Sequence, residues 1–162
     1  MSAMHKNSYL ECFTTNTFAN EKTFMLNVYF AVAANRVIVD SVTNQVSIID
    51  LFENLKSTTF PVLVPKLTFL FYVSREKQDV QTHDLNLVCE LEDQSIFEVS
   101  VRLDFKNEDT TRLVLGVDGL TLTKAGNLKA KLMNKNIELG TLDLAIEQMS
   151  STPTSTSQGL PH

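Results

Sequence analysis

Apolar side chains alternate with polar ones across the second half of the chain, and this period of two constrains the fold more than any other feature. Two runs at residues 84–91 and 97–105 are separated by the turn residues Glu92-Asp93-Gln94. Their apolar positions are Leu85, Leu87, Cys89, Leu91, Phe97, Val99, Val101, Leu103 and Phe105. Successive side chains of a strand lie on opposite faces, so the pattern predicts a hairpin with one buried and one solvated face.

Similar runs recur about every 8–12 residues with turn residues between them, and no helical stretch of about 10–15 residues separates them. A chain of 162 residues is long enough to bury a core without a metal or a disulfide. The sequence therefore predicts an all-β fold, an antiparallel β-sandwich with a small β-barrel as the alternative.

The stretch from Arg36 to Val73 holds the strongest strand signals. Val42–Val46 reads as a turn in which Asn44 tolerates a positive φ, so RVIVD and QVSIIDLF should pair as antiparallel strands. The preceding segment is expected to be one long strand that bends near Asn35. LTFLFYV, which ends at Val73, is expected to bury every second side chain.

Residues 47–57 fit two structures. Ile48, Leu51, Phe52 and Leu55 are spaced as on one face of a helix, which predicts a short helix near 47–56. The β-branched content of VSIIDLF and its place after a turn predict a strand instead.

Three regions are expected along the chain. Residues 1–22 lack a period and are interpreted as an N-terminal arm, residues 23–147 form the sandwich, and the Ser/Thr/Pro-rich residues 148–162 form a disordered tail. No signal peptide and no apolar run of roughly 18 residues is present, so a cytoplasmic protein without a membrane segment is expected. The formal net charge of -5 disfavours a nucleic-acid partner.

A search for chemistry predicts no catalytic residue, no metal site and no cofactor. His83 beside Asp84 is the nearest approach to a catalytic pair, yet no nucleophile lies in a recognisable motif, and a loop histidine is the simpler interpretation. Clustered metal ligands such as HxH or CxxC do not occur. Cys89 is interpreted as a buried thiol, and a Cys12–Cys89 disulfide is the alternative.

A few apolar residues fall on positions that the alternation directs outward, and these are the predicted partner-binding residues: Leu70, Tyr72 and Ala145. An apolar outer face needs a cover, which either the N-terminal arm or another chain could supply.

The segments ANRVIVDSVTNQVSIIDLFENL and FPVLVPKLTFLFYVSRE, with VRLDF and GLTLTKAGNLKAKL further on, resemble a family of uncharacterised bacterial proteins, a domain of unknown function. The resemblance covers residues 33–146. It implies a compact β-sandwich in an intracellular bacterial setting, and it transfers no catalytic residue and no substrate.

Together these features predict a non-enzymatic protein-binding or structural module, such as an accessory subunit of a bacterial assembly. Its partner would be another protein or a second copy of itself. A protein that binds a small carbohydrate, lipid or nucleotide is the alternative, and it would require a cavity or cleft.

Overall fold

The structure is a computed structural model that describes residues 26–77 and 79–150. Every regular element in this part of the chain is a strand, so the all-β prediction is confirmed. The strands are β1 (Asn27–Val39), β2 (Val46–Leu51), β3 (Asn54–Ser57), β4 (Val62–Ser74), β5 (Thr82–Leu91), β6 (Gln94–Asp104), β7 (Thr110–Leu122), β8 (Gly126–Asn134) and β9 (Ile137–Gln148).

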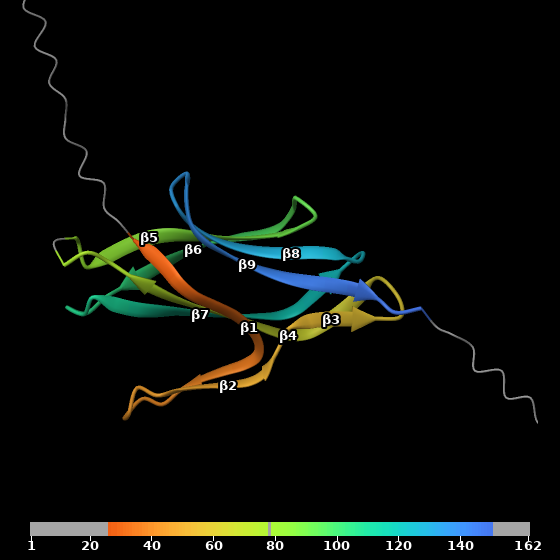
Figure 1. Cartoon of the computed structure of the whole chain (residues 1–162), viewed down its shortest axis with the longest axis horizontal. Coiled ribbons are helices and arrows are strands. Elements are labelled where there is room, and N and C mark those ends of the chain that lie inside the picture. The colour runs from red at the N-terminus through yellow and green to blue at the C-terminus, as the bar shows by residue number, and fades with distance from the viewer. Residues whose placement is uncertain (1–25, 78, 151–162) are drawn as a thin grey trace, which may run out of the picture.

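The strands form two sheets that face each other as a sandwich and do not close into a barrel (Figure 1). Sheet A has the order β2-β1-β4-β7, and sheet B has the order β3-β9-β8-β5-β6. Neighbouring strands are antiparallel except for β3 and β9, which run parallel. The two ends of the described part lie at opposite ends of the long axis of the molecule (Figure 1).

Of the two structures that residues 47–57 fit, the strand is confirmed, and the alternative of a short helix near residues 47–56 is not observed. Residues 46–51 pair with β1, and residues 54–57 leave sheet A to pair with β9 in sheet B. The helical spacing is coincidental, because Ile48 and Leu51 are exposed on β2 while Phe52 and Leu55 pack against the core. β-branched residues and pairing with β1 and β9 outweigh an isolated helical stripe.

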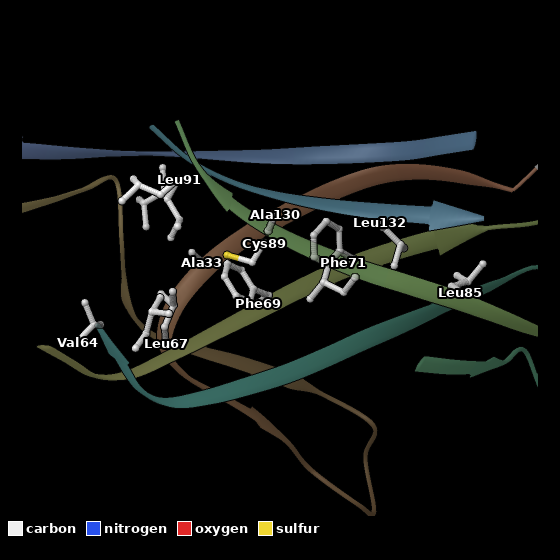
Figure 2. Close-up of a cluster of buried hydrophobic side chains, with 14 of the residues drawn as sticks. Ala33, Val64, Leu67, Phe69, Phe71, Leu85, Cys89, Leu91, Ala130 and Leu132 are labelled. Atoms are coloured by element: carbon white, nitrogen blue, oxygen red, sulfur yellow. The ribbon is translucent and has the colours of Figure 1, made fainter. Parts of the chain in front are cut away.

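The core lies between the two sheets, where the alternating apolar residues of both meet (Figure 2). The predicted inward side chains of β4 and β5 are all buried, namely Leu67, Phe69, Phe71, Val73, Leu85, Leu87, Cys89 and Leu91. On β6 only Leu103 of the predicted strand residues is buried, because β6 is an edge strand and Phe97, Val99 and Val101 keep partial exposure.

β7 passes through Asp118-Gly119, a residue pair typical of turns, as a bend within the strand. The ladder between β4 and β7 continues through it from Lys66↔Asp118 to Val64↔Leu120. Gly119 has a φ of 72°, which other residues adopt only with strain. The bend shifts the buried positions on both strands, so Val64 and Leu120 point into the core at this end of the sandwich.

The described part forms one sandwich and includes most of the expected domain at residues 23–147. The expected N-terminal arm at residues 1–22 lies outside the described residues, as do residues 151–162 of the expected tail. Cys12 also lies outside them, and Cys89 is a buried cysteine that pairs with no other cysteine of the described residues.

Candidate binding surface on a folded-over hairpin

The candidate site begins where β1 changes its partner. β1 pairs with β4 as far as Ala34↔Thr68, and beyond that point it pairs only with β2. Two hydrogen bonds hold this junction: the Thr68 hydroxyl donates to the Asn35 carbonyl at 3.2 Å, and the Asn35 amide donates to the Asp50 carboxylate at 3.1 Å. We call the hairpin from Asn35 to Leu51 the arm; it is distinct from the expected N-terminal arm at residues 1–22.

The turn of the arm is built around Asp40. Its carboxylate accepts the backbone N–H groups of Val42 at 2.8 Å and Thr43 at 2.6 Å, and its carbonyl accepts the N–H of Asn44. Asn44 has a φ of 60°, as expected for a tight hairpin. Hydrogen bonds from Thr43 and Val42 favour the charged form and hold the pKa of Asp40 below its usual value.

The arm folds back across the outer face of sheet A. Its turn residue Asn44 accepts a hydrogen bond from the Arg112 guanidinium of β7, although β1 and β7 stand on opposite sides of β4 in the sheet. Leu70 projects from the outer face of β4 and is nevertheless 0% exposed, and it lies outside the core cluster between the sheets. The arm therefore forms a partial third layer beside the outer face of sheet A (Figure 1), and we infer from the burial of Leu70 that the arm covers it.

The arm carries apolar side chains on both of its faces. Val37, Val39, Val46 and Ile48 share the face of Asn35, and Val37 and Val46 are partly buried. On the other face Ile38 is 44%, Ile49 40% and Leu51 52% exposed. All residues of β2 after Val46 are exposed.

The outer face of sheet B has a different composition. Cross-strand ion pairs occupy it, with Asp84 on Arg102 at 2.8 Å and Glu90 on Lys131 at 2.6 Å. The Arg102 pair lowers the pKa of Asp84, and the Glu90 pair raises the pKa of Lys131. Such pairs are typical of a sheet face in contact with water. The apolar arm is therefore not a general property of this molecule's surface.

A cavity of about 380 Å³ opens at the base of the arm, within the usual size range of ligand pockets. It lies where β1 has left the edge of β4, between that edge and β3. Its apolar walls are Phe52, Leu55, Val62, Leu63, Val64 and Ile146. Its charged residues are Lys56, which pairs with Glu147 at 3.4 Å, and Lys66, which has no carboxylate within 4 Å among the described residues.

The predicted partner-binding residues do not form one surface. Leu70 is buried beneath the arm. Tyr72 is half-buried on the same face, with its ring 5.9 Å from Tyr29 and 5.8 Å from Phe30. Ala145 is exposed on β9 in the other sheet, opposite Asn54 of β3. Sequence reasoning missed the exposed residues of β2. Their signal was a strand with apolar residues on both of its faces.

The side chain of His83 points into the sandwich, whereas the side chain of the neighbouring Asp84 points outward and pairs with Arg102. Its Nε2 atom is 3.0 Å from the Val80 carbonyl and 3.7 Å from the Asp79 carboxylate, and its ring packs edge-on against Phe105. The contacts of this imidazole in the described structure are thus those of a residue that closes a loop. No hydroxyl or thiol is hydrogen-bonded to it within residues 26–77 and 79–150, so the arrangement offers no nucleophile for a catalytic pair.

Two further observations concern chemistry and membranes. Within the described ranges, no three residues among His, Cys, Asp and Glu are gathered so that they could hold a metal ion. The same part of the chain contains no helix of the length and apolarity that would be needed to cross a bilayer.

Sandwich, arm and cavity define an all-β protein of two sheets, antiparallel except for the β3–β9 pair, with a hairpin laid over one of them. The sequence model of a family of unknown function (DUF6941) matches residues 29–147, which include the whole arm and all but the outermost residues of the two sheets. The chain belongs to this family, as the resemblance over residues 33–146 had implied. No curated protein matches the chain.

Proposed function

We propose that this protein is a non-enzymatic protein-binding module whose contact surface is the arm. The observation that carries the proposal is the exposure of Ile38, Ile49 and Leu51 on the outer face of a two-stranded hairpin. A ribbon of two strands is marginally stable in water, and exposed contiguous apolar surface marks sites of association. An accessory role within a bacterial cytoplasmic assembly is part of the same proposal.

The cluster around His83 supports the non-enzymatic part of the proposal. The Arg75 guanidinium donates to the carbonyls of Asp79 at 2.6 Å and Glu108 at 2.9 Å, and it lies 5.4 Å from the Phe105 ring centre. These contacts fix the loop between β4 and β5 against the loop between β6 and β7. A structural role thus accounts for Arg75, while the buried Oδ2 atom of Asp79 has no hydrogen-bond partner among the described residues.

A double variant tests the proposal. Ile49→Ser with Leu51→Ser removes apolar surface from the arm without touching the core, and Ile137→Ser is the matched control because Ile137 is 63% exposed at the start of β9. Tagged wild-type protein should retain a partner from host lysate, quantified by mass spectrometry. The double variant should lose most of it and the control should keep it.

Equal capture by all three proteins would contradict the arm as the contact surface. Thermal melts of each variant should stay close to the wild type, since substitutions of exposed residues rarely change stability by more than about 0.5 kcal/mol. Such melts separate loss of a contact from loss of the fold.

The cavity at the base of the arm favours a second candidate function, the binding of a small apolar molecule with an anionic group. The apolar walls would contact the hydrocarbon part of the ligand, and Lys66 would pair with its anionic group. Saturating medium-chain fatty acids should then raise the melting temperature, and Leu55→Trp should abolish the rise by filling the cavity. No shift with any chain length would eliminate this candidate.

A further inference from the structure

The four sheet edges of the described structure differ in how well they resist pairing with another chain. Soluble proteins protect edges with short strands, charged side chains, bulges and bends. β3 has only four residues and carries Lys56, and β6 carries Glu98 and Arg102 at exposed positions. β7 bends at Gly119 and carries Asp118.

β2 has fewer of these protections than the other three edges. It is six residues long, VSIIDL, and contains no basic residue. Its single charge, Asp50, is already engaged by the Asn35 side chain within the arm. β1 covers one side of β2, and no described strand covers the other, because β2 stands last in sheet A. The free edge of β2 is therefore open and mostly apolar from Val46 to Ile49, ahead of Asp50, whose φ of 54° departs from extended backbone.

We propose that β2 pairs antiparallel with β2 of a second copy of this chain, giving a continuous ribbon in the order β1-β2-β2-β1. This inference rests on the proposed function, since it names the protein that the arm binds. A two-fold axis perpendicular to the ribbon would relate the copies, as in most homodimers. The pairing satisfies the open backbone groups of β2 and turns a marginal pair of strands into four.

The side chains of β2 are complementary to themselves in the register that places Ile48 opposite its own copy. The central row then reads Val37, Ile48, Ile48 and Val37, using the existing pair Val37↔Ile48. Asp50 of each copy falls opposite Val46 of the other, so no two like charges face each other. The net charge of -5 of each chain is therefore not concentrated at the contact.

This charge pattern also selects the second copy over a foreign strand of marked charge. With no free ionic side chain on its edge, β2 offers a charged partner nothing to recognise, whereas an apolar and symmetric edge matches itself. The pocket residues Lys56 and Lys66 lie at the base of the arm and are not part of this edge.

Sedimentation equilibrium and light scattering of the full-length chain over a concentration series test the inference. The wild type should show the mass of a dimer that dissociates on dilution. Ile48→Lys should weaken the dimer by about 100-fold or more, since it sets two ammonium groups face to face. Val42→Lys, which adds the same charge at the exposed turn, should leave the dimer intact.

A second measurement guards against simple unfolding of the Ile48→Lys variant. Deuterium uptake of the wild-type peptide over residues 46–51 should slow as concentration rises, while uptake at the edge strand β6 should not change. A monomer at every soluble concentration, or a dimer that Ile48→Lys leaves unchanged, would overturn the inference.

Different experimental results would contradict the proposed binding function and the proposed dimer. A monomeric wild type that still captures another protein, and loses it with Ile49→Ser and Leu51→Ser, would remove the second copy as partner and leave the binding function standing. A dimer that dissociates with Ile48→Lys but captures nothing else would identify the second copy as the sole partner.

Discussion

Gly140 of β9 is the position at which a single added carbon should matter most. A Cβ there would lie 2.6 Å from Cβ of Val28 in β1, a distance that requires the two strands to move apart. Gly140→Ala should cost about 1–3 kcal/mol of unfolding free energy, as overpacked sites do.

Gly116 in β7 is the matched control, because an added Cβ there would meet only the Thr68 hydroxyl, at 4.0 Å. Gly116→Ala should be neutral or stabilise the protein by up to about 1 kcal/mol, since alanine restricts the unfolded chain. Urea titrations of both variants give the comparison, and equal costs would contradict the close approach of β1 to β9.

Cys89 should be inert in the folded protein. Burial raises the pKa of its thiol to about 12, so the reactive thiolate is scarce at pH 8. In a Cys12→Ser background, iodoacetamide should label Cys89 only after denaturation. The raised pKa also predicts that stability falls as pH rises above about 9, because the unfolded thiol loses its proton first. Rapid labelling of the native protein would show that β5 is not buried as described.

At the scale of elements, the arm has its own dependence on pH through Asp40. The turn hydrogen bonds lower the pKa of Asp40 in the folded state, so they stabilise the turn above its ordinary pKa and are lost as pH falls through the lowered value. Amide exchange at Val42 and Thr43 should therefore accelerate between about pH 5 and pH 2, after correction for intrinsic rates. An Asp40→Ala variant should show fast exchange throughout, and identical profiles for both proteins would contradict the role of the carboxylate.

The stability cost of truncating Leu70 reports how closely the arm packs on sheet A. Leu70→Ala should destabilise the protein by about 2–5 kcal/mol, as truncation of a buried leucine does. Leu63→Ala removes the same atoms from a side chain that is mostly exposed, so it should cost far less. Chemical denaturation of both variants is the test, and similar costs would mean that the arm stands away from Leu70.

These elements also show what could be predicted from the sequence. Local rules of alternation and turn chemistry predict the hairpin of β1 and β2, the inward residues of β4 and β5, and the turn at Glu92-Asp93, and these are confirmed. The burial of every second side chain on β4 is not confirmed, because Thr68 and Leu70 on its outer face are buried as well. The pairing of β3 with β9 joins Asn54 to Ala145 and has no local signal, so residues 47–57 fitted a helix as well as a strand.

The candidate site was harder to predict than the fold for the same reason. Leu70 was recognised as an outward apolar residue that needs a cover, but its cover depends on the contact between Asn44 and Arg112, which are far apart in the chain. The exposure of Ile49 and Leu51 depends on the same fold-back. The alternation of apolar and polar residues along a strand identifies its two faces, but it does not tell which face another segment will cover.

At the scale of the whole molecule, most pairings join distant parts of the chain. β4 pairs with β7, and β3 can pair only after the distant strand β9 is in place. Non-local sheets fold slowly because loops must close before contacts form, so the main refolding phase should take milliseconds to seconds. Stopped-flow fluorescence of the three tyrosines gives the rate, and a main phase in microseconds would contradict this topology.

The opposite positions of the two described ends have a mechanical consequence (Figure 1). Tension between Leu26 and Ser150 would pull β1 and β9 along their own axes. Ladder hydrogen bonds lie across the strands, so such a load would strain many of them at once in shear instead of opening them one after another. The sandwich would therefore transmit force along its length, with a rupture strength set by its unfolding rate rather than by its equilibrium stability.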